Sequence, residues 1–161
     1  MTERQYNDCV NLYADNVYRF ILKNLRHEEN AKDVVQGAFE KLWITREQVQ
    51  NEKCKSYLFT IAYHLMIDFT RKQKRIHLKE KFDETAMGTG NIEINTRRVL
   101  NEALSNLNET HRSLVMLKDY EGYNYAEIGE ITGLNESQVK VYLHRARLQL
   151  KAYLVRVENV I

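Results

Sequence analysis

Apolar residues recur at helical spacing along almost the whole chain of 161 residues, and none of these residues is proline. Proline interrupts the hydrogen bonding of a helix, so its absence removes the strongest local obstacle to long helices. An alternation of apolar and polar residues, which is typical of a half-buried strand, does not occur over any useful length. The sequence therefore predicts an all-α fold.

A change in composition divides the chain into two parts. At this length a chain holds one medium domain or two small ones. Residues 76–95 mix charges of both signs and contain the run Met87 to Asn91, whose glycines do not favour a helix. Helical patterns precede and follow this stretch. We expect two small helical domains, 1–75 and 96–161, joined by a flexible linker at 76–95.

The second domain contains the pattern of two short helices joined at a glycine. Asn124 and Glu127 fit a capping box at the start of the first helix, and Gly133 can supply the left-handed residue that ends it. Asn135 can cap the next helix, with Gln138 at the reciprocal position. One apolar stripe follows, formed by Val139, Leu143, Ala146 and Leu150. Periodicity alone fits a DNA-binding helix-turn-helix and an ordinary helical hairpin about equally.

The distribution of charge favours the helix-turn-helix. The formal net charge is only +2, so any affinity for nucleic acid depends on where the charges lie. Acidic residues precede the turn, at Glu121, Glu127 and Glu130. Basic residues follow it, at Lys140, Arg145, Arg147, Lys151 and Arg156. A duplex attracts the second group and repels the first, which predicts a defined DNA-facing side.

The helix predicted from Ala31 to about Thr45 has two interpretations, one of which is a docking surface. This helix follows a first helix expected from Tyr6 to Leu25. Its inward face is predicted as Ala31, Val34 or Val35, Ala38 and Leu42. Its outward face carries Asp33, Gln36, Glu40 and Trp43, with Phe39 four residues before the tryptophan. Aromatic residues beside charges are typical of protein interfaces. The alternative is that both aromatic residues belong to the core.

A third helix, predicted from Ser56 to Arg75, also has two interpretations. It is rich in aromatic residues, namely Tyr57, Phe59, Tyr63 and Phe69, and it ends in the basic cluster Arg71, Lys72, Lys74 and Arg75. Aromatic rings can stack on exposed bases while cations track the phosphates of melted nucleic acid. The alternative is a buried aromatic core followed by a solvated basic helix end, which also suits the helix dipole.

The sequence lacks the residues that several kinds of site require. Two cysteines, Cys9 and Cys54, make neither a disulfide framework nor a zinc site, and Cys9 fits a packed thiol on an apolar face. We find no phosphate loop, metal-ligand cluster or nucleophile with a base, so we expect no enzyme, no cofactor and no metal. No run of apolar residues has membrane length and the start lacks a signal peptide, which predicts a soluble, cytoplasmic chain without membrane contact.

Three segments in order resemble the extracytoplasmic-function (ECF) class of bacterial sigma factors. Residues 31–43 are similar to that family's polymerase-binding helix, and residues 56–75 to its promoter-melting helix. Residues 107–154 are similar to the domain that reads the minus-thirty-five promoter element. The resemblance implies an all-α protein of two domains that binds core RNA polymerase, directs it to promoters and helps to open the duplex.

The resemblance also implies three sets of site residues. The residues implied for polymerase binding are Asp33, Gln36, Phe39, Glu40 and Trp43. Those implied for contact with the melted minus-ten element are Tyr57, Tyr63, His64, Asp68, Arg71, Lys72, Lys74 and Arg75. Those implied for contact with double-stranded DNA at the minus-thirty-five element are Gln138, Lys140, Val141, His144, Arg145 and Arg147. An anti-sigma factor is a further expected partner.

Four positions depart from the family's pattern. His64 stands where asparagine is usual, Gly37 replaces a glutamate, and Tyr142 replaces a basic or small residue. Asn108 replaces a proline, and as a helix cap it can do much the same job. Two other functions fit parts of the sequence. One is a helix-turn-helix regulator that acts without polymerase, and the other is an adaptor that binds polymerase or a sigma factor without DNA. The basic helix after the turn argues against the adaptor.

Overall fold

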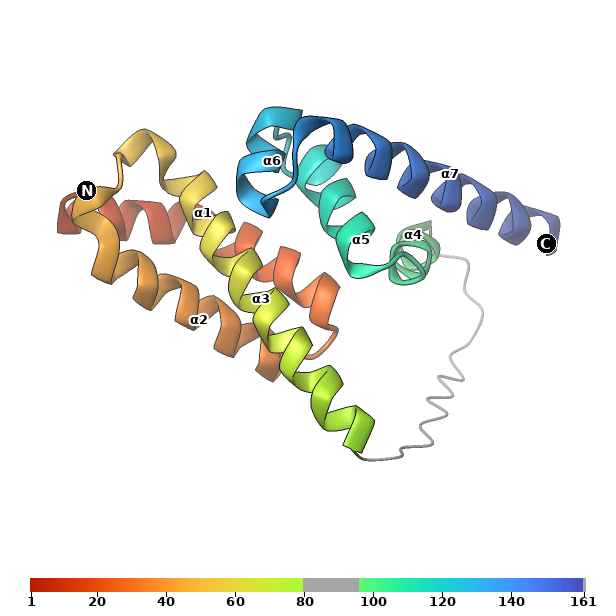
Figure 1. Ribbon diagram of the computed structural model, residues 1–161, viewed down its shortest axis with the longest axis horizontal. Coiled ribbons are helices and arrows are strands. Elements are labelled where there is room, and N and C mark those ends of the chain that lie inside the picture. Colours follow the sequence, from red (N-terminus) through yellow and green to blue (C-terminus); the bar gives the residue numbers. More distant parts are fainter. Residues whose placement is uncertain (80–95, 161) are drawn as a thin grey trace.

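The computed structural model describes residues 1–79 and 96–160, and every regular element within these ranges is a helix (Figure 1). The N-terminal half consists of α1 (Glu3–Leu25), α2 (Glu28–Thr45) and α3 (Cys54–Lys79), with short 3-10 turns at Arg46–Gln48 and Asn51–Lys53. The C-terminal half consists of α4 (Thr96–Ser105), α5 (Glu109–Val115), a π-helical continuation (Met116–Tyr120), α6 (Tyr125–Thr132) and α7 (Glu136–Val160). The predicted all-α fold is confirmed.

The three N-terminal helices surround one core of fully buried side chains. It includes Phe20, Ile21, Leu42, Leu58 and Met66. Both Val34 and Val35 are buried, because α2 packs against α1 on one side and α3 on the other. α1 begins three residues earlier than predicted, since Thr2 and Gln5 form a capping box ahead of the apolar stripe.

The third helix extends beyond its predicted end. α3 runs to Lys79, four residues past Arg75 and into the expected linker. The rest of that linker, residues 80–95, lies outside the described residues. The proposed domain boundaries therefore remain a prediction.

Capping residues determine where the helices of the C-terminal half begin and end, as the sequence predicts. Asn108 starts α5 by accepting a hydrogen bond from the His111 amide at 2.8 Å. Asn124 and Glu127 cap each other at the start of α6. Gly133 ends α6 in the left-handed conformation, with φ of 79°. The predicted stripe of α7 is buried at Val139, Leu143 and Ala146, while Leu150 is half-buried.

The two halves pack directly against each other, which the sequence does not reveal. α3 contacts α6, and α1 contacts both α4 and α5 (Figure 1). Phe59 of the N-terminal half meets Tyr123 of the C-terminal half edge to face, with ring centroids 5.7 Å apart. As a result, one continuous hydrophobic cluster runs through both halves.

Candidate functional site

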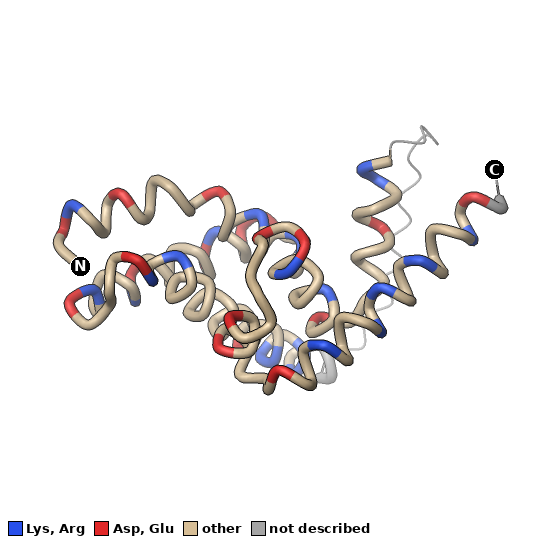
Figure 2. Tube along the Cα trace, turned by 90° about the horizontal axis from the view of Figure 1, so that it is seen from above, with Lys and Arg blue, Asp and Glu red and all other residues tan. Residues whose placement is uncertain are grey.

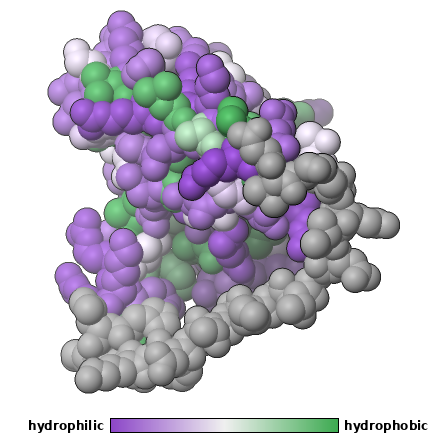
Figure 3. All heavy atoms as spheres, turned by 90° about the vertical axis from the view of Figure 1, so that its right-hand side faces the viewer, coloured by the Kyte–Doolittle hydropathy of each residue, from purple (hydrophilic) through white to green (hydrophobic). Residues whose placement is uncertain are grey.

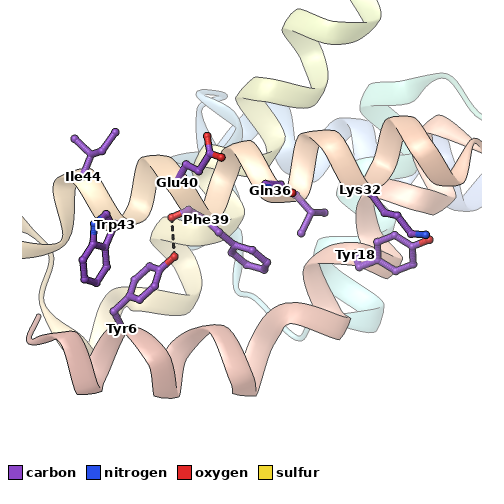
Figure 4. A pocket seen from close by; sticks show the side chains of 9 residues that line it. Tyr6, Tyr18, Lys32, Gln36, Phe39, Glu40, Trp43 and Ile44 are labelled. Atoms are coloured by element: carbon purple, nitrogen blue, oxygen red, sulfur yellow. Dashed lines mark hydrogen bonds between the residues drawn. The ribbon is translucent and has the colours of Figure 1, made fainter.

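A groove of about 760 Å³ lies between α1 and α2 and is lined by aromatic side chains (Figure 4). The Tyr6 hydroxyl donates a hydrogen bond of 2.9 Å to the Phe39 carbonyl oxygen. The ring of Tyr6 meets that of Trp43 edge-on, with centroids 4.9 Å apart. The Arg46 guanidinium lies 3.7 Å from the centre of the indole and donates to the Trp43 carbonyl oxygen. These contacts hold Trp43 in place although the residue is 36% exposed.

Four of the five residues predicted for polymerase binding line this groove. They are Gln36, Phe39, Glu40 and Trp43. Asp33 is exposed on α2 but does not line the groove. The aromatic pair is neither fully buried nor fully exposed, since Phe39 is half-buried and Trp43 reaches the surface. Tyr6, Tyr18 and the exposed Ile44, which were not predicted as site residues, also line the groove.

The predicted minus-ten residues divide between the surface and the interior. The exposed set is Tyr57, His64, Asp68, Arg71, Lys72, Lys74 and Arg75. Tyr57, His64, Asp68, Lys72 and Arg75 follow each other at seven, four, four and three residues, so they share one face of α3.

Tyr63 does not belong to that exposed face. It is only 6% exposed, and its ring meets that of His64 edge-on at 5.5 Å. Burial raises the pKa of the Tyr63 phenol, and the nearby Glu109 of the C-terminal half adds to this increase. The Tyr63 ring is thus buried in this arrangement, and its assignment to the minus-ten element stays a prediction. Phe59 of the same helix is fully buried as well.

The second helix of the helix-turn-helix presents a basic outer face. Lys and Arg residues recur along α7 after the acidic residue at its start (Figure 2). His144 and Arg145 are exposed, and Val141 is 45% exposed beside them. Because this apolar side chain lies between cationic ones on a solvent-facing helix, it is available to a partner.

Three of the predicted minus-thirty-five residues already have partners within the chain. Gln138 accepts a hydrogen bond from the Asn135 amide at 3.0 Å, as the reciprocal half of a cap. Lys140 pairs with Glu136 one turn earlier at 3.6 Å, and both side chains are largely exposed. Arg147 pairs with Asp119 at 2.9 Å. Arg147 therefore connects α7 to the π-helical segment that follows α5, a contact that was not predicted from the sequence.

Gly129 is needed where α6 turns toward α7. A Cβ atom at this position would lie 2.8 Å from the Leu134 carbonyl oxygen, which belongs to the backbone. α6 can approach the turn before α7 this closely only because Gly129 has no side chain. The sequence signal was a glycine inside a short helix, four residues before the glycine that ends it.

The described residues offer no further kind of site. Within 1–79 and 96–160, no group of three His, Cys, Asp or Glu side chains could hold a metal ion. In the same ranges, no helix combines the length and apolar character that crossing a membrane requires. Figure 3, which faces the C-terminal end of α7, shows a largely hydrophilic surface with hydrophobic patches at the level of that helix. Leu148 and Val155, like Val141, are exposed large hydrophobic residues of α7.

Comparisons with known proteins match both halves. The family described as Sigma-70 region 2 matches residues 9–76, and Sigma-70, region 4 matches residues 97–150. RNA polymerase sigma factor SigV of Bacillus subtilis is 33% identical over 149 residues, covering 88% of this chain and 89% of that protein. ECF RNA polymerase sigma factor SigM of the same organism is 28% identical over 151 residues, covering 91% of this chain and 93% of SigM.

Solved structures agree on the fold. The sigma factor RpoE from Bartonella quintana, in complex with the anti-sigma factor NepR, superposes with a TM-score of 0.78 at 21% identity, covering 92% of this chain and 96% of that one. CnrH in complex with the cytosolic domain of CnrY gives a TM-score of 0.71 at 21% identity, covering 96% of this chain and 90% of that one. Because both regions of the sigma-70 family are matched, the class of protein is that of a transcription initiation factor. The chain belongs to the ECF class of RNA polymerase sigma factors.

Proposed function

We propose that this chain binds core RNA polymerase through the groove between α1 and α2, directs the enzyme to two-part promoters and assists melting of the duplex. One observation carries the proposal. A structured aromatic groove, a helix with an exposed basic end and a basic recognition helix occur in the order of regions 2 and 4 of the sigma-70 family. The chain acts without catalytic residues of its own, in the cytoplasm where polymerase and promoter DNA are present.

The groove suits a protein partner better than a small molecule. Trp43 and Tyr6 are aromatic anchors held by their own contacts, and such residues dominate the energy of protein interfaces. Asp33 and Glu40 add exposed negative charge beside them. An apolar helix of polymerase that carries basic residues along its edge would complement this surface in both shape and charge.

The exposed face of α3 supports contact with melted DNA. Tyr57 can stack on a base, at about 1–3 kcal/mol for such contacts, and the cations from Arg71 onward can follow the phosphates. His64 and Asp68 lie between these groups and can hydrogen-bond to the edge of an extruded base. Because Tyr63 is buried, we assign base capture to His64 and Asp68 rather than to Tyr63.

The outer face of α7 supports reading of the minus-thirty-five element in the major groove. Arg145 and Lys140 can donate to guanine edges, and Val141 can contact a thymine methyl group. His144 lies on the same face. Arg147 can reach a phosphate only by exchanging its bond with Asp119, so we place it at the edge of the interface.

An anti-sigma factor is also a proposed partner. The matched structures of RpoE and CnrH are complexes, the first with the anti-sigma factor NepR and the second with the cytosolic domain of CnrY. In this chain the exposed Leu148 and Val155 of α7 provide apolar surface beside basic residues. That combination suits an acidic, amphipathic segment of such a partner.

Run-off transcription with purified core polymerase and genomic promoter fragments tests the function. We expect discrete transcripts that require the chain. The double variant Lys140→Ala/Arg145→Ala should lose transcription while it still binds core polymerase. The double variant Asp33→Ala/Gln36→Ala should lose polymerase binding while it still binds duplex DNA. Both pairs are exposed, so neither should unfold the protein.

Matched controls separate these effects from general loss of charge. Lys41→Ala changes an exposed residue of α2 outside the groove, and Lys53→Ala removes an exposed positive charge from the 3-10 turn before α3, outside all three predicted sites. Both should leave transcription within about twofold, as is usual for surface changes. If no variant or wild-type protein yields transcripts but the chain alone binds duplex DNA tightly, it is a regulator that acts without polymerase.

A further inference from the structure

Two free cysteines that are far apart in the sequence meet in the core of the N-terminal half. Cys9 lies on α1 and is 2% exposed, and Cys54 is the first residue of α3 and is 7% exposed. The two helices pack against each other, and the two thiols form a hydrogen bond. Because the sequence contains no other cysteine, an intramolecular disulfide could join only this pair.

The contact between the thiols satisfies the main geometric requirement for a disulfide. The Cβ atoms of a disulfide lie about 3.5–4.5 Å apart, and pairs that are much more distant need a movement of the backbone. Each sulfur atom is one bond from its Cβ atom. Thiols in hydrogen-bond contact therefore reach the geometry of a disulfide through side-chain rotation and a small approach of α1 to α3.

The two sulfur atoms have different surroundings, which assigns them different roles. Burial raises the pKa of the Cys9 thiol, and the adjacent Cys54 thiol adds to this increase, so Cys9 stays protonated. Cys54 begins α3, and the first turn of a helix stabilises negative charge such as that of a thiolate. The thiolate is the form that peroxides oxidise, so Cys54 is the first to react and Cys9 is its resolving partner.

An oxidant reaches Cys54 through the connection between α2 and α3. This connection contains two 3-10 turns, Arg46–Gln48 and Asn51–Lys53, and neither turn has a buried residue. Segments with few buried contacts open locally at a low cost in free energy while the helices beside them stay folded. Opening of the turn that precedes α3 exposes the Cys54 sulfur to a molecule as small as a peroxide.

We propose that Cys9 and Cys54 are a redox-active pair that hydrogen peroxide converts into a reversible disulfide. The Cys54 thiolate attacks one peroxide oxygen, the O–O bond breaks, and the leaving hydroxide takes up the proton that the thiol had lost. The Cys9 sulfur then attacks the resulting sulfenic acid, and the hydroxyl group leaves as water with the Cys9 proton. In total, two thiols and one peroxide give one disulfide and two water molecules. A small thiol reverses the reaction by exchange, as for the transient disulfides of reducing compartments.

The disulfide closes a covalent loop around the groove between α1 and α2. Every residue that lines the groove lies between Cys9 and Cys54, except Tyr6, which lies one turn before Cys9. A cross-link restricts the unfolded chain and so stabilises the folded segment inside its loop. Oxidation therefore keeps the groove folded under conditions that unfold the reduced chain. This inference goes beyond the proposed function, and the chemistry of the pair does not depend on it.

Mass spectrometry of the full-length chain tests the proposal. Protein treated with hydrogen peroxide is denatured in the presence of iodoacetamide, which labels free thiols. We expect wild type to become lighter by two hydrogen atoms and to take up no label, and dithiothreitol should restore two labelled cysteines. Two labelled cysteines after peroxide would overturn the proposal. A sulfinic acid or a disulfide-linked dimer as the main product would overturn it as well.

Two single variants test the roles assigned to the two sulfur atoms. Cys9→Ser should stop at the sulfenic acid of Cys54, which dimedone traps, and Cys54→Ser should leave Cys9 unmodified over the same time. Equal oxidation of the two variants would overturn the assignment. Circular dichroism checks that each variant is folded, and alanine replaces serine where the hydroxyl group disrupts the core. The mass change of wild type needs no variant.

Urea denaturation of the oxidised and reduced protein measures the consequence. We expect a higher midpoint for oxidised wild type and the same midpoint for Cys9→Ser with and without peroxide. Equal midpoints for the two forms of wild type would overturn the stabilising role of the disulfide.

Binding to core polymerase separates this inference from the proposed function. The two cysteines do not line the groove, so the oxidised and reduced forms should bind with affinities within about twofold of each other. Loss of binding on oxidation would contradict a disulfide that preserves the groove. Absence of binding by both forms would refute polymerase binding instead, and the mass and denaturation results would still decide whether the redox pair exists.

Discussion

Replacement of Gly129 by alanine should weaken the helix-turn-helix, although alanine normally favours a helix. The new Cβ atom would lie 2.8 Å from the Leu134 carbonyl oxygen, whereas ordinary van der Waals contacts of a Cβ atom begin at 3.4 Å. Because that oxygen belongs to the backbone, the turn itself must shift. Overpacking of this kind costs about 1–3 kcal/mol. The gain in helix propensity offsets about 1 kcal/mol of this.

Gly37 provides the matched control, since it lies inside α2 at a position where alanine fits. Its Cβ atom would lie 3.4 Å from a terminal methyl group of Leu65, a flexible side chain. We therefore expect Gly37→Ala to raise the free energy of unfolding by about 0.4–1 kcal/mol. Gly129→Ala should lower it by up to about 2 kcal/mol. The same chemical change thus has opposite signs in the two helices.

Urea denaturation followed by circular dichroism measures both effects. In addition, fluorescence anisotropy with a labelled promoter duplex should show weaker binding for Gly129→Ala and unchanged binding for Gly37→Ala. The affinity should fall because the position of α7 depends on the turn that Gly129 permits. If Gly129→Ala proved as stabilising as Gly37→Ala, the close approach of α6 to the turn would not exist in solution.

Two further predictions concern single side chains. Asp119→Asn removes the anionic partner of Arg147 and should change stability by less than about 1 kcal/mol, because the pair is exposed. It should tighten duplex binding measured by anisotropy, and unchanged affinity would place Arg147 away from DNA. Burial raises the pKa of Tyr123, with a smaller contribution from Glu121. Stability from Tyr123 is therefore present below pH 10, roughly the ordinary tyrosine pKa, and is lost as pH rises from there through the raised pKa. Tyr123→Phe should flatten this loss in denaturation curves at pH 8 to 11, and an equal loss in both proteins would exclude Tyr123 as its source.

Features encoded within a few residues were predictable from the sequence. The caps at Asn108, Asn124 and Asn135 form as predicted, because each satisfies amide groups only three residues away. The left-handed Gly133 and the buried stripe of α7 are likewise local patterns. They also determine which side of α7 faces outward, and hence most of the predicted minus-thirty-five face.

The orientation of the aromatic residues in α3 could not be predicted with the same success. Phe59 and Tyr63 were candidates for stacking on bases, yet both are buried. α3 contacts α1 and α2 on one side and α6 on another, so it has two buried faces instead of one. The second buried face depends on a segment more than sixty residues later in the sequence, and periodicity within α3 does not report it.

Asn24 carried a signal of the domain contact that the sequence analysis left unused. It follows Val17, Phe20 and Ile21 at helical spacing, so it continues the buried stripe of α1 with a polar side chain. A buried amide requires a partner. In the structure that partner includes Arg112 of the other half. A polar residue in a core register thus indicated an interface, but only the fold could identify its other side.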